Sequence, residues 1–203
     1  MSPESFTLRI PDAAIADLKT RLGLTRFPDA APGEPWAFGA SVDYMRDLVA
    51  YWKDGFDWRV QEAALNAFPQ FSVPLHGIDL HYLHVPGVGP NPYPLLLMHG
   101  WPGSVFEFID VIPRLTDPGR FGGDPKDAFT VIAPSLPGYG LSFKPGQKRF
   151  VLQDMAACLH DLMTQVLGYT RFAAQGGDWG AGVASLMGQS YPSSLCGIHL
   201  NLL

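Results

Sequence analysis

A single carboxylate stands among glycines in the segment FAAQGGDWGAG, residues 172–182. The spacing Gly176-x-Asp178-x-Gly180 is typical of a nucleophile elbow, a sharp strand-to-helix turn, with aspartate where serine often stands. Larger flanking side chains would collide with the strand or the helix, and the helix N-terminus favours the anionic carboxylate. Such a carboxylate could attack an electrophilic carbon. The same spacing also suits an aspartate that only caps the following helix, so the motif alone leaves both interpretations open.

Two further loops rich in glycine and proline each follow a predicted strand. They are HGWPGS, residues 99–104, and SLPGYGLS, residues 135–142. An enzyme with a nucleophile elbow needs two backbone N–H groups to hold the anion of a tetrahedral intermediate, and the pattern predicts Trp101 and Trp179 as these donors. Each loop alone could be an ordinary turn, but three loops in this order favour an active site. The predicted site comprises the nucleophile Asp178, the oxyanion hole of Trp101 and Trp179, and the structural motif residues His99, Gly100, Pro102, Gly176, Gly177 and Gly180.

The elements that must position these loops follow from the hydrophobic pattern. Residues 71–75 and 78–85 predict an antiparallel hairpin that turns at His76 and Gly77. From residue 95 onward, strands and helices alternate, which is typical of a parallel α/β sheet whose chemistry gathers at the carboxyl ends of the strands. The predicted strands are 95–100, 129–135, 171–175 and 196–203, and the predicted helices are 105–115, 152–167 and 181–190.

The first part of the chain has a different, helical pattern. Helices are expected over residues 12–22, 42–54 and 58–67, and the region is rich in aromatic side chains. At helical spacing such side chains usually pack against a neighbour. We therefore predict a helical N-terminal extension, residues 1–70, which packs on an α/β core formed by residues 71–203.

Composition narrows the class of protein. Charged residues make up only 16% of the 203 residues and the net charge is −5, which leaves no basic surface for nucleic acid or anionic lipid. The two cysteines, Cys158 and Cys196, have no metal-site or disulfide spacing, and both are expected to be buried thiols. No signal peptide or membrane anchor is recognised, so a cytoplasmic protein without metal or organic cofactor is expected.

HGWPGS, PSLPGYGLS and GGDWG together resemble the epoxide hydrolases of the microsomal type, and the helical N-terminal segment is similar to the extension of that group. The resemblance implies an α/β-hydrolase fold, and hydrolysis of a small apolar epoxide to a vicinal diol in detoxification or aromatic hydrocarbon catabolism. A carboxylate is ionised at neutral pH and can open the strained ring directly, which would leave an alkyl-enzyme ester on Asp178. Water would then attack the ester carbonyl. A serine would instead form an ether that water does not readily cleave.

The resemblance also implies groups that this chain does not supply. The family uses a histidine to activate the hydrolytic water and cap tyrosines to protonate the epoxide oxygen, all after the sixth strand of the sheet. None of the six histidines lies in that place: His99 belongs to the loop, and His76, His81, His84 and His160 suit structural roles. We therefore expect a sheet that is incomplete at its C-terminus and a C-terminal remainder, covalently linked or supplied as a second chain. The chain alone is expected to be inactive.

Two alternatives remain open. A haloalkane dehalogenase also combines an HGxP loop with an aspartate followed by tryptophan, although such enzymes usually lack a long helical extension. A non-catalytic binding module with this fold would explain the missing histidine and cap, but it would not need a strained nucleophile turn.

Overall fold

The computed structural model describes residues 2–202 and divides the chain into two compact units. One unit comprises the residues up to Thr7 and those from Leu65 onward, and the other is Leu8–Ala64. The first unit contains the sheet and all three sequence motifs, while the second contains most of the helical extension.

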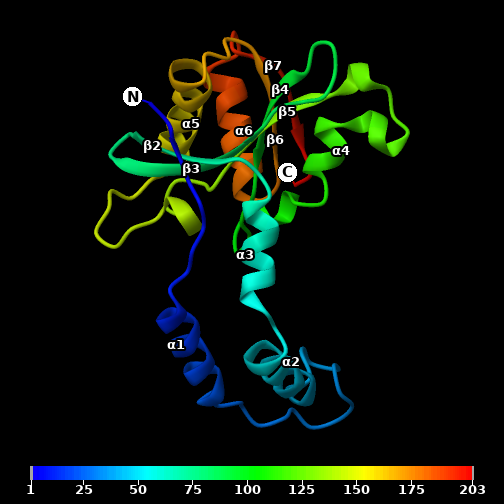
Figure 1. Cartoon of the computed structure of the whole chain (residues 1–203). Coiled ribbons are helices and arrows are strands. Elements are labelled where there is room, and N and C mark those ends of the chain that lie inside the picture. Colours follow the sequence, from blue (N-terminus) through cyan, green and yellow to red (C-terminus); the bar gives the residue numbers. More distant parts are fainter. Residues whose placement is uncertain (1, 203) are drawn as a thin grey trace. The chain divides into compact units, whose positions relative to one another are not determined.

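The sheet has seven strands in the order β1-β2-β3-β5-β4-β6-β7 (Figure 1). The four strands at one side of the sheet pair in parallel, and the other three run antiparallel to their neighbours. This arrangement confirms the predicted α/β sheet with an antiparallel first hairpin. The strands are β1 (Glu4–Ser5), β2 (Gln70–Leu75), β3 (Ile78–Val85), β4 (Tyr93–Met98), β5 (Phe129–Pro134), β6 (Phe172–Gly176) and β7 (Leu195–Leu200).

The hairpin turns where the sequence predicted. His76 and Gly77 both have positive φ, 51° and 84°, as a two-residue turn between antiparallel strands requires. The two-residue strand β1 was missed because so short a strand shows no alternation, yet it pairs with β2 through Glu4 and Ser72.

Helices cover both faces of the sheet. The helices α5 (Leu152–Asp161) and α6 (Trp179–Ser190) lie side by side on one face, and α4 (Ile112–Thr116) lies on the other (Figure 1). The main core lies beneath α5 and α6, where Leu96 and Met98 of β4 pack with Val183 of α6. The alternate residues of β4, Leu95 and Leu97, line an apolar groove of about 520 Å³ on the opposite face.

Two expectations about this unit are wrong, and a third is confirmed with a difference in its last turn. The helix predicted over 105–115 is instead a 3-10 turn, Val105–Phe108, followed by α4, because Pro113 has no N–H to continue a helix from the preceding turn. The helix predicted over 152–167 is confirmed as α5, and its continuation over Leu162–Val166 is a π-helical turn. Cys196 is exposed rather than buried, since it lies on β7 at the edge of the sheet, whereas Cys158 is buried as expected.

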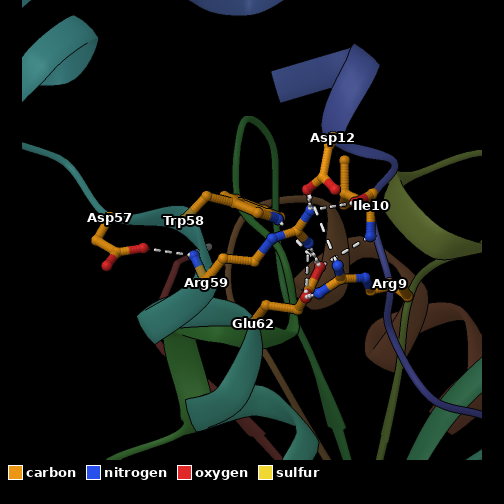
Figure 2. A network of polar contacts seen from close by, with 7 residues as sticks. All are labelled: Arg9, Ile10, Asp12, Asp57, Trp58, Arg59 and Glu62. Carbon is orange, nitrogen blue, oxygen red and sulfur yellow. Dashed lines mark hydrogen bonds and ion pairs between the residues drawn. The ribbon is translucent and has the colours of Figure 1, made fainter. Parts of the chain in front are cut away.

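The helical unit contains α1 (Asp12–Gly23) and α2 (Val42–Asp54), and most of α3 (Trp58–Asn66). Glu62 of α3 is 4% exposed and accepts hydrogen bonds from the Ile10 N–H at 2.8 Å and from Arg59 Nη1 at 2.8 Å (Figure 2). Arg59 also donates to the Ile10 carbonyl at 2.8 Å and contacts Asp12. These hydrogen bonds hold the segment that precedes α1 against the first turns of α3 (Figure 2). The docking of the extension on the core stays a prediction.

Candidate active site

Asp178 lies at the sharp turn between β6 and α6. Its backbone has φ 51° and ψ −122°, which a non-glycine residue rarely adopts, and α6 begins at the next residue, Trp179. No side-chain hydrogen bond from Asp178 caps the helix. A costly backbone conformation of this kind persists only where the surrounding structure enforces it. The absence of a cap bond weakens the interpretation of Asp178 as a simple capping residue.

The glycines beside Asp178 explain how the turn is enforced. A Cβ added at Gly176 would lie 2.1 Å from the carbonyl oxygen of Gly180, and one at Gly180 would lie 2.4 Å from that of Met98. Both clashes are with backbone atoms that cannot rotate away. The predicted steric requirement for glycine is therefore confirmed at these two positions, where the ends of β4 and β6 meet the first turn of α6.

The loop of residues 99–104 approaches Asp178 from the end of β4. A Cβ at Gly100 would lie 2.6 Å from the Asp178 Cβ, so only glycine permits this approach. The next residue, Trp101, donates its backbone N–H to Asp178 Oδ1 at 2.8 Å. The Trp101–Pro102 peptide bond is cis.

Two backbone donors favour the ionised form of Asp178. The N–H of Trp101, and next that of Trp179, lower the pKa of the Asp178 carboxyl below its ordinary value, although burial opposes this effect. The carboxylate is therefore available as an anion at neutral pH. These are the two N–H groups that the sequence predicted as the donors of an oxyanion hole.

His99 joins this loop to the one that follows β5. Its ring is 1% exposed, Nδ1 donates to the Gly100 carbonyl at 2.8 Å, and Nε2 accepts the Leu136 N–H at 3.0 Å. Burial lowers the pKa of His99, which keeps the imidazole neutral. With both nitrogens occupied by backbone groups, His99 supports the loop and is not available as a base.

Tyr139 was not assigned to the site from sequence. Its ring meets His99 edge-on, with 6.0 Å between ring centroids, and its pKa is raised by burial and by the negative charge of Asp178. The loop SLPGYGLS therefore brings a phenol near the carboxylate. The only sequence signal was the position of this loop after a predicted strand.

A pocket of about 520 Å³ opens over Asp178. It is lined by Gly100, Trp101, Pro102, Gly103, Glu107, Gly177, Asp178, Asn201 and Leu202. Asn201 was not predicted: its side chain lies against Gly177 and accepts a hydrogen bond from Gln175 Nε2 at 3.2 Å. The indole of Trp101 is 66% exposed, so the pocket has an apolar wall beside its carboxylate.

Four other histidines pair with polar groups elsewhere. His76 lies 2.8 Å from Asp161, His81 2.9 Å from Ser135 Oγ, His84 3.1 Å from the Tyr169 hydroxyl and His160 3.0 Å from Ser194 Oγ. These contacts fit the structural roles expected for them. Within residues 2–202, no three histidine, cysteine or acidic side chains gather as metal ligands, and no helix is both long and apolar enough to cross a bilayer.

The sheet order, the elbow after β6 and the backbone donors at Asp178 define the fold as that of an α/β hydrolase. The family model described as alpha/beta hydrolase fold matches residues 93–201, and the model described as Epoxide hydrolase N terminus matches residues 3–108. The chain belongs to this epoxide hydrolase family.

Relatives agree over nearly the whole chain. A protein of Stigmatella aurantiaca is 48% identical over 196 residues, and Epoxide hydrolase 1 of Oryctolagus cuniculus is 40% identical over 201 residues. Each alignment covers 97% of this chain and 44% of the relative, so the chain spans less than half the length of these relatives. The solved structure of Aspergillus niger epoxide hydrolase matches with a TM-score of 0.85 and 34% identity, over 100% of this chain and 53% of that one.

Proposed function

We propose that the protein to which this chain belongs hydrolyses an epoxide to a vicinal diol, with Asp178 as the nucleophile. The observation that carries this proposal is the carboxylate at the elbow, which is exposed to the pocket and kept ionised by the N–H groups of Trp101 and Trp179. A group that only capped a helix would not need the strained turn or the convergent donors.

In the first step, an Asp178 oxygen attacks a ring carbon of the epoxide. The bond between that carbon and the ring oxygen breaks, the ring oxygen takes a proton from an acid, and a hydroxyalkyl ester of Asp178 forms. The ring strain of the substrate makes a carboxylate a sufficient nucleophile. The apolar surface of Trp101, Pro102 and Leu202 in the pocket suits a small apolar epoxide.

In the second step, water attacks the carbonyl carbon of the ester. The negative charge on the tetrahedral intermediate would be held by the N–H groups of Trp101 and Trp179, because they already converge on the Asp178 carboxylate. The bond to the diol oxygen then breaks, the diol leaves with a proton, and the carboxylate returns with one oxygen from water.

The water-activating base and the ring-opening acid are proposed to come from a C-terminal remainder of the enzyme. His99 is occupied by Gly100 and Leu136. The side chains of His76, His81, His84 and His160 pair with groups away from the elbow. We therefore expect no turnover by the 203-residue chain alone, while slow formation of the ester remains within its reach.

The test uses the chain with styrene oxide as the probe. Intact mass under denaturing conditions, taken before and after incubation, should show a gain of one epoxide, localised to Asp178 by peptide mapping. Asp178→Asn should remove the adduct, and Asp124→Asn, which changes an exposed aspartate away from the elbow, should keep it. An adduct that survives in Asp178→Asn, or no adduct in the parent chain, contradicts this nucleophile.

The same measurement separates the alternatives. A dehalogenase would form an ester from a chloroalkane and release chloride, so the chloroalkane would alkylate Asp178 faster than the epoxide does. A binding module would form no ester with either probe. The match of residues 3–108 to the epoxide hydrolase N terminus favours the epoxide.

A further inference from the structure

A buried network of polar side chains contacts the loop of residues 135–142. His81 of β3 is 0% exposed, its Nδ1 lies 2.9 Å from Ser135 Oγ, and its Nε2 lies 3.0 Å from Gln70 Oε1. None of these three side chains lines the pocket over Asp178. The proposed reaction does not use them directly.

The partners of Gln70 determine where the protons lie. Gln70 Nε2 donates to the Leu65 carbonyl at 3.3 Å and to Asn66 Oδ1 at 2.8 Å, so its amide oxygen must accept from His81. The proton of His81 is therefore on Nε2, and Nδ1 accepts the hydroxyl proton of Ser135. Burial lowers the pKa of His81 to about 4, which keeps this neutral tautomer at neutral pH.

Both ends of the loop of residues 135–142 are hydrogen-bonded to His81. At one end, the Ser135 N–H donates to the His81 carbonyl at 3.0 Å, in addition to the bond between Ser135 Oγ and the ring. At the other end, Ser142 Oγ accepts the His81 N–H at 3.0 Å and donates to the Ser135 carbonyl at 2.7 Å. One residue of β3 thus holds the first and last residues of the loop together.

The loop is in turn bonded to the donor at Asp178. Leu136, the neighbour of Ser135, donates its N–H to His99 Nε2 at 3.0 Å. His99 Nδ1 donates to the Gly100 carbonyl at 2.8 Å, and the next N–H, that of Trp101, donates to Asp178 at 2.8 Å. The two buried histidines have opposite tautomers, each fixed by its own partners.

We infer that His81 is a positioning residue which, through Ser135 and His99, holds the Trp101 N–H against the Asp178 carboxylate. As far as catalysis is concerned, the inference rests on the proposed function, because it assigns His81 to the alignment of the oxyanion donor. Its structural content, the coupling between His81 and the hydrogen bond from Trp101 to Asp178, can be measured without any reaction.

The experiment follows two signals by NMR in the 203-residue chain: the backbone amide of Trp101 and the titration of the Asp178 carboxyl carbon. Ser135→Ala and His81→Leu should both shift the Trp101 amide and raise the pKa of Asp178 toward its ordinary value. His81→Asn places an amide near the position of Nδ1 and should restore part of both signals. Ser135→Ala removes a single oxygen, so it serves as the main variant if His81→Leu does not fold.

Matched controls separate this coupling from general damage. Ser194→Ala removes another serine hydroxyl that pairs with a histidine, His160. His84→Leu replaces a second histidine of β3, the strand that contains His81. Neither should move the two signals. The inference is overturned if Ser135→Ala leaves them unchanged, or if the controls move them equally. The donor stabilises a charge that ester formation removes, so the rate of adduct formation at Asp178 should not fall in Ser135→Ala. A parent chain without adduct would contradict the proposed function, while the NMR signals still decide this inference.

Discussion

Trp101 donates its backbone N–H to Asp178 Oδ1 at 2.8 Å, although 77 positions separate the two residues in the sequence. The ends of β4 and β6, which pair in parallel through Met98 and Gly176, bring them together. In the proposed reaction the ester would remove the negative charge from Asp178, and the tetrahedral intermediate would restore it. The preorganised Trp101 N–H is therefore most effective in the second step, where the tetrahedral intermediate carries the negative charge again.

The proximity of Tyr139 to Asp178 predicts a coupled titration. The carboxylate raises the pKa of Tyr139, so Asp178→Asn should lower the pKa of that phenol. Tyr169, whose pKa is raised by burial alone, should titrate as before. NMR titration of the ring carbons of Tyr139 and Tyr169 checks this prediction. An unchanged pKa of Tyr139 in the Asp178→Asn variant would place its hydroxyl away from the carboxylate.

Replacing glycine by alanine should have opposite effects on stability at two positions of α6, Gly180 and Gly188. Gly180→Ala places a Cβ 2.4 Å from the Met98 carbonyl oxygen, a rigid backbone atom, and should destabilise the chain by about 2–3 kcal/mol. Gly188→Ala, in the same helix, places its Cβ 3.5 Å from Ile198 Cδ1 and should stabilise the chain by about 0.5–1 kcal/mol. Urea unfolding of both variants measures the difference. Equal effects would show that the elbow backbone can yield.

Patterns among residues that are neighbours in the sequence predicted part of the fold and part of the candidate site. The helix expected over residues 42–54 is α2, Val42–Asp54, and the elbow glycines meet the clashes that the motif implies. Those features depend on neighbours in the chain. Tyr139, Asn201 and the partners of His81 depend on contacts between distant segments, and a lone histidine in a strand shows no periodic signal that would reveal its partners.

Cysteine exposure gives a direct test of the strand at the edge of the sheet. Cys196 is exposed on β7, whereas Cys158 is 0% exposed and burial raises its pKa to about 12. A thiol reagent should therefore modify one cysteine in the folded chain and both after unfolding. Cys196→Ser should abolish the reaction of the folded chain. Rapid modification of Cys158 under native conditions would contradict the packing of α5 on the sheet.

The network around Glu62 predicts an acid-dependent stability of the helical unit. The Ile10 N–H, followed by Arg59, lowers the pKa of Glu62 below its ordinary value of 4.5, against the effect of burial. Because the folded pKa is the lower one, the ionised carboxylate stabilises the unit above pH 4.5, and this contribution is lost as the pH falls through the folded pKa. Glu62→Gln should reduce this loss. It should not abolish the loss, because the pKa of Asp12 is lowered by Arg59 in the same way.

Hydrogen exchange of the Ile10 amide, which donates to Glu62 at 2.8 Å, measures this effect locally. In the parent chain, its protection factor should fall as the pH drops below 4.5 and through the lower folded pKa, and the fall should be smaller in Glu62→Gln. Asp17→Asn is the control, because Asp17 pairs with Arg21 on the exposed side of α1 and does not belong to the network. An equal fall in the parent chain and in Glu62→Gln would assign the acid sensitivity to other groups. The contacts of Glu62 with Ile10 and Arg59 would then hold the segment before α1 without contributing to its dependence on pH.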